Sequence, residues 1–122
     1  MEDWEQDFAY QRVRHLIQQR FNRPALPDLN ALLFLIGVQE LGRWQTDFTK
    51  EEKQDLMHIA VCRLLEQDGH YRFVGRDADG WPHYDLVSKV PPADLRGQEA
   101  LLKRRIVAYF GALEAEEGML DS

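Results

Sequence analysis

The sequence predicts a mainly α-helical α+β domain with one β-hairpin, in the order helix, helix, helix, hairpin, helix. Apolar residues recur at helical spacing in three segments, a fourth segment is apolar on every side, and the spacing changes to alternation in one segment before the last helix. The dipeptide Asp79-Gly80, typical of a tight hairpin turn, lies in the middle of that alternating segment. A chain of 122 residues with 44% hydrophobic residues suits a single domain over 1–122. The expected bounds are helices at about 3–21, 28–41, 49–67 and 94–117 and a hairpin at about 70–88.

The first helix, 3–21, is predicted to have two apolar sides. Asp3 can cap its N-terminus, with Gln6 three residues later. Its core side consists of residues at spacings of three and four: Ala9, Tyr10, Val13, Leu16 and Ile17. Trp4, Phe8 and His15 lie on a different side, so they either make a second internal contact, for example with the C-terminal helix, or form a surface for a partner.

The second helix, 28–41, is predicted to be enclosed by neighbours. Asp28 can cap it, and Gly42 is a natural C-terminal stop. Residues 31–36 are apolar on every side of the helix, a pattern typical of a central core helix, with an oligomer interface as the alternative. Gly37 allows another helix to approach closely.

The third helix, 49–67, begins with a capping box in which Thr49 and Glu52 exchange hydrogen bonds. Gly69 ends it. Its outer side carries four residues at helical spacing, and a solvated polar face is the favoured interpretation of them: Glu51, Asp55, His58 and Cys62.

The hairpin, 70–88, is predicted to place its apolar residues on one face. With a two-residue turn at Asp79-Gly80, Phe73 lies opposite Leu86, and Gly75 lies opposite Tyr84. The outer face then carries Arg72, Arg76, His83 and Asp85. Pro91-Pro92 ends the second strand, and Asp94 begins the last helix.

Composition favours a cytoplasmic protein without a membrane partner. The acidic N-terminus is unlike a signal peptide, and the apolar run 31–36 is far too short to cross a bilayer. Cys62 is the only cysteine, so no intrachain disulfide is expected. A net charge of −6 opposes nonspecific attraction to nucleic acid, although a local basic patch could overcome it.

The motif candidates do not support an enzyme. Counted from Asp77 as a calcium loop, position six is Pro82 and position twelve is Ser88, where glycine and glutamate are needed. Residues 37–42 have the glycine spacing of a phosphate loop but lack its lysine and hydroxyl residue. We therefore predict no catalytic residues and no cofactor, and a turn at 77–80.

The remaining candidate for chemistry is a metal site on the third helix. His58 and Cys62 could both reach one zinc ion, with Asp55 as a third ligand, but the solvated face is favoured and no metal is predicted. A thiol nucleophile at Cys62 with His58 as its base is disfavoured, because Cys62 lies far from the helix N-terminus that would lower its pKa.

The favoured function is a non-enzymatic protein-interaction or oligomerisation module that binds either a protein partner or itself, as a homodimer. The expected partner surface consists of aromatic and imidazole side chains: Trp4, Phe8, His15, Trp81 and His83. The alternative is a nucleic-acid-binding protein, because the element order is winged-helix-like, with the hairpin as the wing. Its contacts would be Arg72, Arg76, Lys103, Arg104 and Arg105. The net negative start of the helix 49–67 disfavours this alternative, since it would repel phosphates.

Three segments together resemble a family of small uncharacterised bacterial proteins. The segments are LLFLIGVQELG at 32–42, EEKQDLMHIAVC at 51–62 and DGWPH at 79–83. The resemblance covers about 28–88 and implies a bacterial cytosolic protein. It implies no activity and no site residues.

Overall fold

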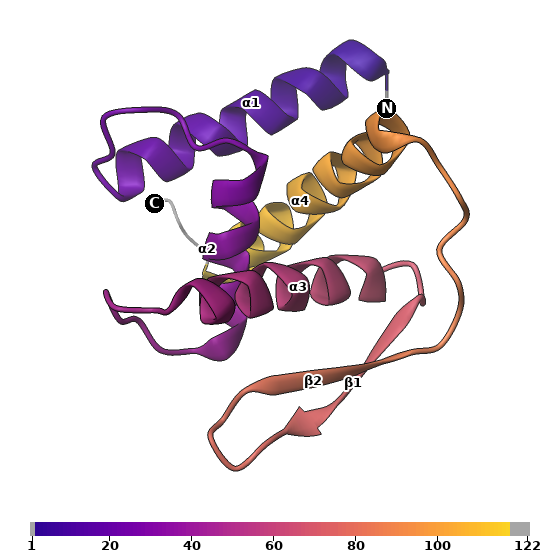
Figure 1. Ribbon diagram of the computed structural model, residues 1–122. Helices are drawn as coiled ribbons and strands as arrows, with labels where there is room; N and C mark the ends of the chain where they lie inside the picture. Colours follow the sequence, from indigo (N-terminus) through magenta and orange to yellow (C-terminus); the bar gives the residue numbers. More distant parts are fainter. Residues whose placement is uncertain (1, 118–122) are drawn as a thin grey trace. The chain divides into compact units, whose positions relative to one another are not determined.

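The elements follow one another in the predicted order. A computed structural model describes residues 2–117, so residues 1 and 118–122 of the expected domain lie outside it. Figure 1 labels the helices and strands α1 (Asp3–Arg20), α2 (Leu29–Leu41), α3 (Lys50–Glu66), β1 (Tyr71–Arg76), β2 (Pro82–Leu86) and α4 (Leu95–Glu117). The α+β fold class and the order helix, helix, helix, hairpin, helix are therefore confirmed. Within 2–117, none of the helices has the length and apolar character needed to cross a membrane.

The chain divides into two compact units. One unit, Asp28–Pro92, contains α2, α3 and the hairpin, and the other combines α1 and α4 from the two ends of the chain. The single domain over 1–122 stays a prediction.

In the terminal unit, α1 and α4 contact each other through apolar and charged side chains. The buried residues are Tyr10, Val13 and Ile17 of α1 and Ile106 and Tyr109 of α4. The Lys103 ammonium lies 5.2 Å from the centre of the Tyr10 ring, a distance typical of a cation–π contact. The predicted cap of α1 is wrong by one residue: Glu2 is the N-cap, and its backbone N–H donates to the Glu5 carboxylate at 3.0 Å.

In the central unit, the predicted helix ends are confirmed. The Asp28 carboxylate accepts from the backbone N–H of the third residue of α2 at 2.8 Å, and Gly42 ends α2 with φ +84°. At α3, the Glu52 N–H donates to the Thr49 hydroxyl at 3.0 Å while the Thr49 N–H donates to the Glu52 carboxylate at 2.8 Å.

The core of the central unit lies between α2 and α3. Residues 31–38 of α2 include no exposed position, so the expected enclosure of this helix is confirmed. A Cβ on Gly37 would lie 2.6 Å from the backbone carbonyl carbon of Leu56, which shows how closely α3 approaches. The glycine thus permits backbone contact between the two helices.

The hairpin has a different register from the predicted one. Phe73 pairs with Tyr84, not with Leu86, and a β-bulge follows Phe73, so that Gly75 pairs with His83. The turn explains the shift: the Asp77 N–H donates to the Trp81 carbonyl at 3.0 Å and encloses a three-residue loop in place of the expected two-residue turn. The extra residue at the bulge places Arg76 opposite Pro82, on the same face as Pro82 and not on that of His83, because paired residues share a face; Arg76 itself is exposed.

Candidate functional site

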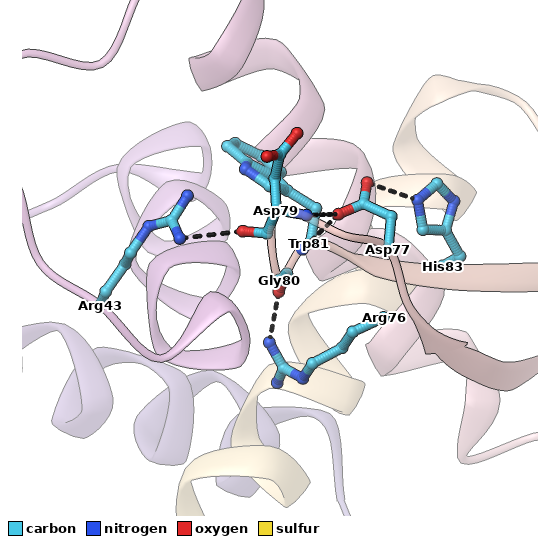
Figure 2. A network of polar contacts seen from close by, with 7 residues as sticks. All are labelled: Arg43, Arg76, Asp77, Asp79, Gly80, Trp81 and His83. Atoms are coloured by element: carbon cyan, nitrogen blue, oxygen red, sulfur yellow. Dashed lines mark hydrogen bonds and ion pairs between the residues drawn. The ribbon is translucent and has the colours of Figure 1, made fainter.

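The hairpin corner is organised by the carboxylate of Asp77. One oxygen accepts from the backbone N–H groups of Asp79 at 2.9 Å and Trp81 at 3.0 Å, and the other lies 3.0 Å from Nε2 of His83 (Figure 2). These contacts, led by the hydrogen bond from His83, hold the pKa of Asp77 below its ordinary value. Asp77 therefore fixes the turn and orients the exposed imidazole of His83.

Two arginines attach this corner to the C-terminal end of α2 and to the segment that follows it. The Arg43 guanidinium donates to the Asp79 carbonyl at 2.9 Å, and Arg76 donates to the Gly80 carbonyl at 2.8 Å (Figure 2). Arg76 also donates, at 2.6 and 3.0 Å, to the terminal carbonyls of α2, those of Glu40 and Leu41. A cation at a helix C-terminus is stabilised by the helix dipole. The expected position of Arg76 on the outer face is therefore wrong.

Trp81 serves the core of the central unit. It packs, together with Tyr84, against the buried cluster of Val38, Leu41, Phe48, Leu56 and Ile59. Pro82 is buried as well. Trp81 and Pro82, which follow the turn, thus anchor the hairpin to the core. Of the two hairpin residues expected in the partner surface, Trp81 and His83, only His83 is exposed.

An open groove of about 370 Å³ lies between α3 and this corner. It brings together the candidate metal ligands of α3 and the hairpin histidine, and its lining residues are Asp55, His58, Ile59, Cys62, Asp77, Trp81, Pro82, His83 and Tyr84. The sequence placed these two groups of residues on separate elements. Their shared groove is a product of tertiary structure.

Cys62 is buried, so the predicted solvated face of α3 is wrong for this residue. Its exposure is 3%, and its Sγ lies 3.6 Å from Nε2 of His58. Burial raises the pKa of the Cys62 thiol to about 11, so the thiol is protonated at neutral pH and is a poor nucleophile. Among residues 2–117, no group of three or more His, Cys, Asp or Glu side chains is arranged to hold a metal ion.

The cations expected at a nucleic-acid interface belong to different units and have local contacts. Arg72 lies 3.5 Å from the Asp85 carboxylate across the hairpin, and Lys103 lies over Tyr10 in the terminal unit. Arg104 is exposed, and Arg105 is half-buried. With Arg76 bound to α2, the hairpin does not present the expected pair of arginines on one face.

The exposed side of α1 is the clearest apolar surface of the terminal unit. Trp4 and Phe8 are each 69% exposed, and His15 is exposed on the same side of the helix. Neither aromatic residue is covered by α4, so the alternative of a second internal contact is not supported. The opposite side of α1 carries the buried residues Val13 and Ile17.

The roles of Arg43 and Asp77 in holding this corner were not predicted from the sequence. The role of Asp77 could have been predicted, because an aspartate in a turn often bonds through its side chain to the backbone two residues later, here that of Asp79, and so forms an Asx-turn. The contact of Arg43 could not be predicted from the sequence pattern, because its partner is the backbone carbonyl of a distant residue.

No protein-family model matches the chain, and the searches of curated proteins and of solved structures also found no match.

Proposed function

We propose that the chain is a non-enzymatic protein-interaction module that binds a protein through the exposed side of α1. The exposure of Trp4 and Phe8 is the observation that carries this proposal. Large aromatic side chains are enriched at the centres of protein interfaces, where they contribute most of the binding energy. On an isolated chain they leave apolar surface in water, which is costly unless a partner covers it.

The chemistry of the groove supports a non-enzymatic role. Its thiol is protonated at neutral pH, and the Asp77 carboxylate is engaged by the turn that it stabilises. An acyl-transfer site would need a nucleophile activated by a base within hydrogen-bond reach. Cys62 does not meet that requirement, because burial keeps its pKa high.

Site-specific crosslinking tests the proposal. A photoreactive amino acid replaces Phe8 of the full chain in the cells that produce it, and a matched variant carries it at Trp44, which is 57% exposed in the central unit. We expect a defined protein adduct, identified by mass spectrometry, from position 8 and not from position 44. The adduct should disappear when Trp4→Ala is added. Equal labelling from both positions, or no adduct from position 8, would contradict the proposal.

The nucleic-acid alternative has weaker support. The first turn of α3, which would lead into the major groove, carries Glu51 and Glu52 and would face phosphates with negative charge. Binding of labelled duplex DNA at low salt, lost in an Arg72→Ala/Arg104→Ala variant, would favour this alternative over the first.

A further inference from the structure

We infer that the occupant of the exposed side of α1 is a second copy of this chain, with the two α1 helices packed antiparallel. This inference rests on the proposed function, because it names the partner of the same surface. Three features of α1 support it: the exposed aromatic stripe, the separation of charge along the helix, and the position of those charges beside the stripe.

The stripe has the spacing of a short coiled-coil seam. Trp4, Phe8, Gln11 and His15 recur at alternating intervals of four and three residues, and all four are exposed. The seam from Trp4 to His15 is about 16 Å long at the α-helical rise. In an antiparallel pair centred on it, Phe8 faces Gln11 of the second copy, and Trp4 faces His15.

Charge is separated along α1. The acidic residues, Glu2, Asp3, Glu5 and Asp7, precede Phe8, and the basic residues, Arg12, Arg14 and Arg20, follow it. Antiparallel packing places the acidic half of each helix beside the basic half of the other, whereas parallel packing aligns the two acidic halves and the two basic halves and brings opposite charges together only between Asp7 and Arg12. The helix can therefore complement a second copy of itself.

The charges also lie at the two edges of the seam. With about 100° between successive residues, Glu5 and Arg12 fall on one edge, and Asp7 and Arg14 fall on the other. Antiparallel helices bring equivalent edges together, so Glu5 meets Arg12 of the second copy and Asp7 meets Arg14. A parallel pair would instead place Asp7 beside Arg12 and leave Glu5 and Arg14 without an opposite charge across the seam.

The contacts within one copy are compatible with this arrangement. Arg12 is 3.4 Å from the Glu114 carboxylate, and this pair is exposed, so the guanidinium can also face a second acid. Arg14 is held at its edge by its Nε–H bond to the Pro27 carbonyl at 2.8 Å. Both guanidinium groups are thus positioned beside the seam.

Sedimentation of the purified full chain gives the first test. A seam of this size predicts a weak dimer, with a Kd of roughly 1–100 µM. We expect Trp4→Ala and Phe8→Ala each to raise the Kd by about tenfold or more, since aromatic residues at an interface centre are hot spots. Trp44→Ala is the control and should leave the Kd within about twofold of the unmodified chain. A monomer at all concentrations, or a dimer insensitive to Trp4→Ala and Phe8→Ala, would overturn the inference.

Charge reversal tests the antiparallel arrangement. Glu5→Arg and Arg12→Glu should each weaken self-association by about tenfold, because each places like charges together across the seam. An equimolar mixture of the two variants should form a heterodimer as tight as the original dimer, because every reversed residue then faces an opposite charge. Circular dichroism checks that both variants keep their helix content. Failure of the mixture to associate would overturn the antiparallel arrangement, since a local defect in α1 is not repaired by mixing.

The two proposals fail in different ways. If position 8 crosslinks a different protein in cells while the purified chain is monomeric, the further inference fails and the proposed function stands. If position 8 gives no adduct and the purified chain is monomeric, both fail. A purified dimer that depends on Phe8, with adducts between two copies in cells, supports both.

Discussion

Replacing Gly37 with alanine tests how the helices of the central unit pack. In an isolated helix, alanine is favoured over glycine by about 1 kcal/mol, so local propensity predicts a more stable protein. The structure predicts the opposite. A Cβ at this position would lie 2.6 Å from the Leu56 carbonyl carbon and 2.9 Å from the Leu56 Cβ, closer than side chains tolerate.

The expected magnitude follows from which atoms must move. The obstructing atoms include backbone of α3, so α3 must shift as a whole, because no flexible side-chain end can rotate away. Overpacking of this kind costs about 3 kcal/mol, the upper end of the usual range. After the gain of about 1 kcal/mol from helix propensity, Gly37→Ala should lower the free energy of unfolding by about 2 kcal/mol.

Gly111→Ala provides the matched control. Gly111 is also helical, and a Cβ there would have nothing within 4 Å, so only the propensity gain of about 1 kcal/mol is expected. Thermal and urea unfolding measure both variants. For a chain of this length we expect the Tm to fall by about 8 °C for Gly37→Ala and to rise by about 4 °C for Gly111→Ala. A stabilised Gly37→Ala variant would refute the argument that α2 and α3 pack backbone against backbone.

Three further predictions concern the hairpin corner and the groove. Alkylation of Cys62 at pH 7.4 should be at least about 100-fold slower in the folded protein than in urea. The reason is that a thiol pKa raised from 9.0 to about 11 lowers the thiolate fraction by about that factor. Equal alkylation rates in the two states would contradict the burial of Cys62. Because the folded pKa of Asp77 lies below its ordinary value of 3.8, its carboxylate stabilises the turn above that pH, and this stabilisation is lost as the pH falls through the folded pKa. The protection factor of the Trp81 amide, which NMR measures as its exchange rate relative to the intrinsic rate at the same pH, should therefore fall in acid, and Asp77→Asn should abolish this pH dependence; an unchanged dependence would exclude Asp77 as its source. Arg76→Ala should reduce the free energy of unfolding by about 1–2 kcal/mol, because the bonds to the α2 carbonyls are lost. The control is Arg72→Ala, which removes an exposed ion pair and should change the free energy of unfolding by less than about 0.5 kcal/mol. Equal losses in urea unfolding would contradict the role of Arg76 in capping α2.

The hairpin shows why a correct element can have an incorrect register. Asp79-Gly80 correctly indicated a turn, and the alternation correctly indicated two strands. The same residues fit a two-residue or a three-residue loop, and the Asp77 side chain together with the bulge after Phe73 selects the latter. The contacts of Arg76 with α2 also favour the bulged register. They join segments distant in the chain, so the local sequence pattern does not predict them.

The exposed side of α1 and the groove beside α3 also differ in how far the sequence predicts them. The sequence placed Trp4 and Phe8 away from the apolar stripe that α4 covers, but their exposure was only one of two alternatives that it left open. The sequence did not predict the inward position of Trp81 or the burial of Cys62, because each depends on where the hairpin lies against α3.

The sequence by itself determined the helices, the N-terminal caps of α2 and α3, and the position of Trp4 and Phe8 away from the core side of α1, because helical spacing and capping are interactions between residues a few positions apart. Only the tertiary structure decided the register of the hairpin, the contact of Arg76 with the C-terminal end of α2 and the residues that line the groove. These depend on contacts between segments distant in the chain, and side-chain pattern within one segment does not encode the geometry of another.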